Sequence, residues 1–179
     1  MPPSIVLIIA LVNSDQVLLL SILILSETMQ KITTFLTYND QAEAAVKLYT
    51  SIFKDSAILN TTYYGGLTSG HVMTVEFTLA GQRYIAMNGG PYFNFTDGIS
   101  LQVTCENQAE IDELWQQLTT NGGKPGQCGW LKDPFGVAWQ ITPVHLGQLL
   151  RSDDPERAKR KIAALMQMHK IDIATLENA

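Results

Sequence analysis

The stretch Asn39-Asp40-Gln41-Ala42-Glu43 recurs later in the chain as Glu106-Asn107-Gln108-Ala109-Glu110. An internal repeat of this kind indicates that the chain contains one structural unit twice, although two helix starts can also resemble each other by chance. Asp40 and Asn107 are both good N-caps, and the glutamate three residues after each of them matches the acidic half of a capping box. Each pentapeptide is therefore predicted to open a helix.

The residue patterns on either side of the pentapeptides also repeat. A short β-type run precedes each one, at residues 32–38 and 99–105. Three further runs rich in β-branched and aromatic residues follow the first helix, and three shorter runs follow the second. They are residues 57–64, 71–79 and 82–88 in the first half, and residues 125–128, 130–132 and 137–142 in the second. Each half is therefore predicted to be a βαβββ unit, which gives an α+β fold.

A sheet of this kind carries its helix on one face and leaves the other face uncovered. Two such units can cover each other, so we expect residues 29–143 to form a pair of half-barrels with a ligand cavity inside. Residues 144–179 follow a different pattern, because Asp154 can cap a helix whose first position is Pro155. We expect a helical tail that packs on the barrel or on a second subunit.

Residues 1–28 form an apolar leader without lysine or arginine. The missing positive n-region argues against a signal peptide. A single membrane span would place Asp15 near its middle, at a cost of about 2.5 to 3.5 kcal/mol. The globular pattern begins just after Met29, so we expect Met29 to be the natural start and the leader to lie outside the fold. A membrane anchor is the alternative.

Composition limits the partners and the compartment. The formal net charge is -5, and the basic residues are scattered except for those at 157–161. Nucleic acid needs a dense positive face, so no nucleic-acid partner is expected. The two cysteines, Cys105 and Cys128, form no C-x-x-C motif. A reducing, cytoplasmic location fits them best.

Two further stretches resemble a known family. They are Ala86-Met87-Asn88-Gly89-Gly90-Pro91 and Gly126-Gln127-Cys128-Gly129-Trp130-Leu131-Lys132-Asp133. Both are similar to the PhnB-like branch of the vicinal oxygen chelate superfamily, which includes glyoxalases and bleomycin-resistance proteins. This branch often bears the name 3-demethylubiquinone-9 3-methyltransferase-like. The resemblance runs from about Met29 into the tail at residues 168–174, and it implies the paired βαβββ fold that the repeat predicts independently.

The resemblance also implies where a metal would bind. In metal-dependent members of the superfamily, His, Glu or Gln side chains on the first and last strands of each unit hold a divalent ion. The corresponding positions here are Thr33, Met87, Ser100 and Gln140. Hydroxyl and thioether groups are poor ligands for such ions, so we expect no strong metal site and treat Gln140 as a weak candidate. The histidines of the chain lie outside these positions: His71, His145 and His169.

The methyltransferase name can be tested against the glycines. S-adenosylmethionine enzymes of the usual class need a glycine-rich strand-to-helix turn with an acidic residue after the next strand. The glycine pairs at 65–66, 89–90 and 122–123 are instead predicted at strand junctions and a helix end. No S-adenosylmethionine cofactor is expected.

The expected cavity is lined by both sheets and by loops. Strand alternation assigns to it Thr33, Phe35, Met87, Ser100, Gln102 and either Trp139 or Gln140, and loops add Tyr92, Phe93, Cys128 and Trp130. This lining suits a small, partly apolar ligand, although the aromatic residues can also be core. Cys128 is a weak candidate nucleophile, because no His or Lys adjoins it in the sequence. Glu76 lies on a predicted strand and can point inward or outward.

Two classes of function therefore stay open. The first is a non-catalytic module that binds a small molecule. The second is a small-metabolite enzyme of glyoxalase, dioxygenase or, as the family label has it, 3-demethylubiquinone-9 3-methyltransferase type, acting through Gln140 or Cys128. The sequence does not decide whether a reaction is catalysed. We also expect a homodimer, because each half-barrel leaves an edge strand available for pairing.

Overall fold

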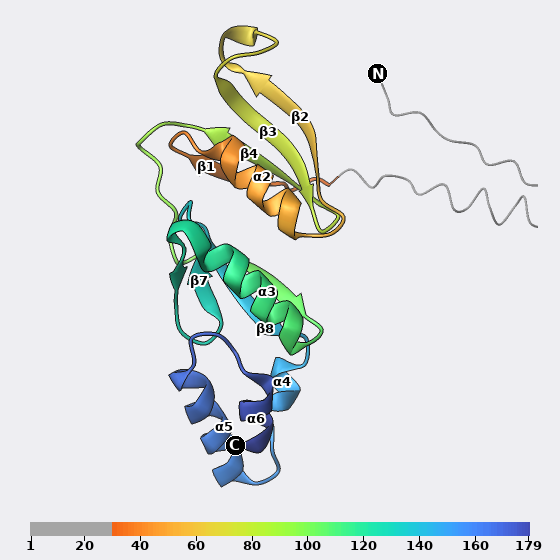
Figure 1. Cartoon of the computed structure of the whole chain (residues 1–179), viewed down its shortest axis with the longest axis vertical. Coiled ribbons are helices and arrows are strands. Elements are labelled where there is room, and N and C mark those ends of the chain that lie inside the picture. The colour runs from red at the N-terminus through yellow and green to blue at the C-terminus, as the bar shows by residue number, and fades with distance from the viewer. Residues whose placement is uncertain (1–29) are drawn as a thin grey trace, which may run out of the picture. The chain divides into compact units, whose positions relative to one another are not determined.

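The internal repeat becomes two four-stranded mixed sheets, each with one helix on one face (Figure 1). The computed structural model describes residues 30–179, so the leader predicted at 1–28 lies outside the described residues. The fold is that of the unit Thr33–Ala179. Among the described residues, no helix is long and apolar enough to cross a membrane.

The first repeat contains strands β1 (Thr34–Tyr38), β2 (Ala57–Tyr63), β3 (Val72–Leu79) and β4 (Gln82–Asn88), with helix α2 (Ala42–Ile52) after β1. The strands lie in the order β1-β4-β3-β2. Strands β1 and β4 are parallel, whereas the other neighbours are antiparallel. Strands β1 and β4 can be parallel because the chain leaves β1 through the crossover helix α2 and then forms β2 and β3 before it enters β4.

The second repeat has the same topology with shorter strands. It contains β5 (Leu101–Cys105), helix α3 (Gln108–Thr119), β6 (Lys124–Pro125), β7 (Trp130–Lys132) and β8 (Ala138–Pro143). Their order is β5-β8-β7-β6, which matches that of the first sheet. The prediction of an α+β fold made of two βαβββ units is therefore confirmed.

The strand predicted at residues 125–128 is largely wrong, because only Lys124–Pro125 is extended in a sheet. The following residues turn back, with positive φ at Cys128 (56°) and Gly129 (86°). Their backbone N–H groups donate to Met168 O (2.8 Å) and His169 O (2.7 Å) in the tail. These two donors are therefore satisfied outside the sheet ladder.

The two helices begin differently. Asn107 caps α3 as predicted, since its side chain accepts from the backbone N–H of Glu110 (3.0 Å). The prediction that Asp40 caps α2 is wrong, because the N-cap is Gln41 and no side chain of its own turn caps this helix. The backbone N–H of Ala42 instead donates to Asn88 Oδ1 at the end of β4 (2.9 Å). A group that is distant in sequence therefore replaces the local cap.

Helix α2 buries its apolar side on one face of the first sheet. Residues of β1, β3 and β4 alternate between buried and less buried positions, and the buried ones meet the helix. This core contains Leu36, Tyr38, Ala42, Ala45, Val46, Tyr49, Val75, Phe77, Leu79, Tyr84 and Ala86. In the second repeat, Ile111, Leu114 and Leu118 of α3 are buried in the same way.

The tail forms helices α4 (Leu146–Leu149), α5 (Pro155–Gln167) and α6 (Ile173–Asn178). Asp154 caps α5 as predicted, because its side chain accepts from Glu156 N (3.0 Å). The amide of Gln108 binds the tail twice, donating to Ile171 O (3.0 Å) and accepting from Ile173 N (2.9 Å). The tail therefore packs against the second repeat of its own chain.

Candidate functional site

Each sheet has its helix on one face only, and we call the other face its open face. Because side chains alternate along a strand, every second side chain projects from the open face. On the first sheet, the central row of this face runs across all four strands. Phe35 is in register with Ile85, Ile85 with Glu76, and Glu76 with Asn60. A parallel row contains Thr37, Met87 and Thr74, and residues in register on neighbouring strands project to the same side. The first open face therefore combines apolar, hydroxyl and charged side chains.

The open face of the second sheet is a set of hydrogen-bonded neutral groups. Gln140 Nε2 donates to Ser100 Oγ (2.8 Å), and Gln102 Nε2 donates to Thr142 Oγ1 (3.1 Å). Trp130 is in register with Gln140 and lies on the same face. These contacts hold the two glutamine amides in defined orientations.

The predicted lining residues fall on these two faces. Phe35 and Met87 lie on the open face of the first sheet, where Phe35 is 49% exposed, and Thr33 directly precedes β1. Gln102, Trp130 and Gln140 lie on the second sheet, and Ser100 directly precedes β5 and contacts Gln140. The choice left open between Trp139 and Gln140 is resolved toward Gln140, because Trp139 is buried on the helix side of its sheet.

The loop residues are more scattered. Tyr92 is 88% exposed on the connection between the two repeats. Phe93 lies beside the first open face, since a Cβ at Gly89 would come within 3.0 Å of its ring and 2.5 Å of Thr37 Cγ2. Glycine at position 89 therefore allows the close approach of these two side chains.

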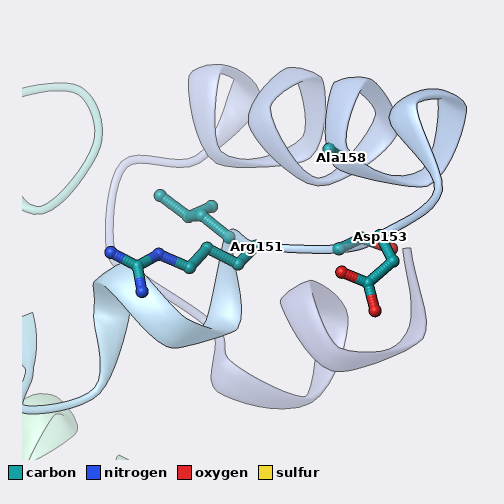
Figure 2. Close-up of a pocket in the computed structure, with 5 residues that line it drawn as sticks. Arg151, Asp153 and Ala158 are labelled. Carbon is teal, nitrogen blue, oxygen red and sulfur yellow. The ribbon is translucent and has the colours of Figure 1, made fainter.

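Two hollows lie away from the predicted lining residues. One, of about 560 Å³, is in the tail and is lined by Leu150, Arg151, Ser152, Asp153 and Ala158. Figure 2 shows the charged groups of Arg151 and Asp153 reaching away from each other, so they do not converge on a common point. The other, of about 380 Å³, lies between α2 and α3 and includes Leu48, Ile52 and Gln117.

The four positions at which the family would hold a metal do not suit a divalent ion. Thr33 and Ser100 offer hydroxyls and Met87 a thioether, all poor ligands for such an ion, and Gln140 adds one amide oxygen. The histidines have contacts elsewhere. His71 stacks on Tyr64 and lies 3.6 Å from Asp40, whereas His169 Nδ1 contacts Gly126 O. Among the described residues, no group of three or more His, Cys, Asp or Glu side chains could hold a metal ion.

The two cysteines differ in their surroundings. Cys128 contacts the tail, with Sγ 3.5 Å from Leu165 O and 3.7 Å from Met166 Sδ. Cys105 is fully buried, and burial, together with the nearby charge of Glu110, raises the pKa of its thiol to about 12. A thiol with so high a pKa carries almost no thiolate at neutral pH, so Cys105 is a core residue.

Sequence reasoning missed a buried carboxylate. Asp133 is 2% exposed, and its Oδ2 accepts from Tyr49 OH (2.6 Å) and Trp139 Nε1 (2.9 Å). Its Oδ1 accepts from the backbone N–H groups of Phe135 (2.9 Å) and Val137 (3.0 Å). Burial raises the pKa of Asp133, and the four donated hydrogen bonds oppose that shift.

This carboxylate links the two repeats, because Tyr49 belongs to α2 whereas Asp133 and Trp139 belong to the second repeat. Tyr38 extends the network, with its hydroxyl 3.2 Å from that of Tyr49. The sequence Asp133-Pro134-Phe135-Gly136 is typical of a turn, but it carries no signal that a tyrosine far away in sequence would reach it. The network therefore has a structural role between the repeats.

The fold defines a class of protein, that of paired βαβββ units. A family model described as 3-demethylubiquinone-9 3-methyltransferase matches residues 30–142. The chain belongs to this family, the PhnB-like branch of the glyoxalase/bleomycin-resistance superfamily. The tail after residue 142 lies outside the match.

Solved structures agree with this assignment. A PhnB protein from Bacillus cereus is 36% identical, with a TM-score of 0.59, over 64% of this chain and 100% of that one. Protein PA1353 from Pseudomonas aeruginosa is 19% identical, with a TM-score of 0.53, over 63% of this chain and 96% of that one, and this likeness concerns the fold alone. Among curated proteins, nothing matches the chain.

Proposed function

We propose that this protein binds a small, partly apolar organic molecule on the open faces of its sheets, without a strong divalent metal site. The observation that carries the proposal is that the two open faces offer different groups, apolar side chains on the first and fixed amides on the second. Phe35, Ile85 and Met87 present apolar surface on the neighbouring strands β1 and β4 of the first sheet. An aromatic side chain that is half exposed there gains by contact with an apolar ligand.

The second open face supplies orientation. Gln140 and Gln102 use their amide nitrogens within the sheet. Within the part of the chain that the structure describes, their amide oxygens are available to accept hydrogen bonds from a ligand. Trp130 lies in register with Gln140 and adds apolar surface beside these amides. A few fixed polar groups beside an apolar surface are typical of sites that bind small molecules.

A second copy of the chain is the partner that we propose, in a cytoplasmic homodimer. Each sheet ends in outer strands whose free edges are available for pairing with a second copy, which leaves the open faces to the ligand. The two thiols, neither of which is in a disulfide, support a reducing compartment. Light scattering at micromolar concentration should give twice the mass of the chain, and the mass of a monomer would refute the dimer.

The binding proposal can be tested with 2-phenylethanol, a small neutral aromatic. Thermal unfolding of the wild-type protein should shift upward with millimolar ligand, because a ligand that binds only the folded state stabilises it. Phe35→Ala and Gln140→Ala should each reduce the shift. Leu67→Ala is the matched control, since Leu67 is also exposed but lies in a loop outside both sheets.

The same experiment separates binding from catalysis. The ligand should be recovered unchanged, and metal analysis of the purified protein should show no stoichiometric divalent ion. An unshifted unfolding temperature, or a full shift in Phe35→Ala, would refute the binding site. Turnover that is lost in Gln140→Ala and depends on a bound metal would instead support the enzyme alternative.

A further inference from the structure

An inner strand of the first open face holds one carboxylate, next to an apolar side chain. Glu76 lies on β3 directly opposite Ile85 of β4, and Ile85 lies directly opposite Phe35 of β1. Sequence reasoning left its direction open, and the register places it on the face that the helix does not cover. Because β3 is neither the first nor the last strand of its repeat, Glu76 is distinct from the positions at which the family would hold a metal.

This carboxylate is only weakly engaged by the chain itself. Its Oε2 lies 3.4 Å from Arg83 Nη2, and the two side chains are 37% and 54% exposed. Four lysine–carboxylate pairs in the described residues are tighter, with nitrogen–oxygen distances of 2.5 to 2.9 Å. An exposed pair with one long contact stabilises the fold little. A ligand can therefore displace the guanidinium at small cost.

The spacing of the row defines what such a ligand would look like. Phe35 and Glu76 are two strand positions apart, which corresponds to about 10 Å between their backbones. An aromatic ring packed on Phe35 and Ile85 therefore leaves room for a short linker before the carboxylate. A cation at the end of that linker gains a charge-assisted hydrogen bond, whereas an anion there is repelled.

We infer that the first open face takes an aromatic or apolar ligand that carries a positively charged amine, and that Glu76 is the residue that selects for the charge. The inference rests on the proposed function, because it assigns a substrate class to the same site. Asn60 adds a neutral polar side chain at the outer end of the row. Phe35 and Ile85 supply the apolar contact at the other end.

Three probes of nearly equal size test the charge selectivity: 2-phenylethylammonium, 2-phenylethanol and 3-phenylpropanoate. Their affinities for the full chain are measured by chemical-shift titration at neutral pH. The cation should bind about tenfold more tightly than the neutral alcohol, and the anion should bind more weakly than both. Glu76→Gln should abolish this preference while leaving the affinity for 2-phenylethanol within about twofold.

Two further variants complete the test. Glu43→Gln is the matched control, because Glu43 is also a half-exposed glutamate in an ion pair, with Lys47 at 2.9 Å, but lies on α2 away from the face. It should keep the preference for the cation. Arg83→Gln keeps Glu76 and removes its competitor, so the preference should increase. This variant keeps the inference testable if Glu76→Gln fails to fold.

The outcomes distinguish the two levels of the proposal. If 2-phenylethanol binds but Glu76→Gln keeps the cation preference, or if the anion binds best, the inference is refuted and the proposed binding site stands. If none of the three probes binds the wild-type protein, both are refuted. A preference for the cation that disappears only in Glu76→Gln supports both.

Discussion

The N-terminus of helix α2 is capped by a side chain from a distant strand, whereas the N-terminus of helix α3 is capped by residues next to it in the sequence. In the first repeat, Asn88 at the end of β4 accepts from Ala42 N. In the second repeat, Asn107 accepts from Glu110 N, and Glu110 Oε2 accepts from Glu106 N (2.7 Å). The two similar pentapeptides therefore both open a helix, the first with a tertiary hydrogen bond and the second with local ones.

The two repeats also differ in how they complete their cores. The first repeat has strands of seven or eight residues at β2, β3 and β4, whereas β6 and β7 in the second have two and three. The second repeat gains the tail, whose Ile171 and Leu176 are fully buried. The buried carboxylate of Asp133 then ties this half to α2 of the other. The tail and the buried hydrogen bonds of Asp133 thus stabilise the shorter sheet of the second repeat.

The largest effect should come from breaking the link between the repeats. Asp133→Ala leaves two buried side-chain donors and two backbone donors without their acceptor, so we expect a loss of about 3 to 5 kcal/mol in the free energy of unfolding. Tyr49→Phe removes one of these donors and should cost about 1 to 2 kcal/mol. Urea unfolding followed by circular dichroism measures both. Equal losses in the two variants would contradict the central role of Asp133.

An intermediate effect is expected where the first helix depends on a distant residue. Asn88→Ala removes the acceptor of Ala42 N and the donor to Val72 O, which are joined at 2.9 and 3.0 Å. Both bonds are buried, so the free energy of unfolding should fall by about 2 kcal/mol. Amide hydrogen exchange should increase in the first turn of α2 and leave the first turn of α3 unchanged. Faster exchange in α3 alone would contradict this account.

The smallest effect should come from the local cap of the second helix. Asn107→Ala should cost about 1 kcal/mol, the usual value for an N-cap. The equivalent change in the first repeat, Asp40→Ala, should cost less than about 0.5 kcal/mol, because Asp40 is exposed and does not cap α2. Thermal unfolding of the two variants gives the comparison. A larger loss from Asp40→Ala would restore the symmetric capping that the sequence suggests.

Much of the fold could be predicted because its signals are local. The repeated pentapeptides, the alternating runs and the cap at Asp154 each depend on neighbours along the chain, and they led to two βαβββ units and a helical tail. The strand prediction at 125–128 was wrong because backbone N–H groups of this turn donate to the carbonyl groups of Met168 and His169. Such distant partners leave no mark on the local pattern.

The candidate site was predictable only in part for the same reason. Alternation placed Phe35, Met87 and Gln102 correctly on uncovered faces, because the side-chain period of a strand is a property of the backbone. It left the direction of Glu76 open and did not choose between Trp139 and Gln140. Those choices depend on which face the helix covers.

The sequence alone therefore determined the repeat and the family, since both follow from which residues stand at which spacing. Tertiary structure decided that Asn88 caps the first helix, that Tyr49 reaches Asp133, and that Glu76 lies in one row with Phe35 on an uncovered face. These are contacts between residues far apart in the chain. Their free energy depends on three-dimensional distance and burial, and local spacing does not encode either quantity.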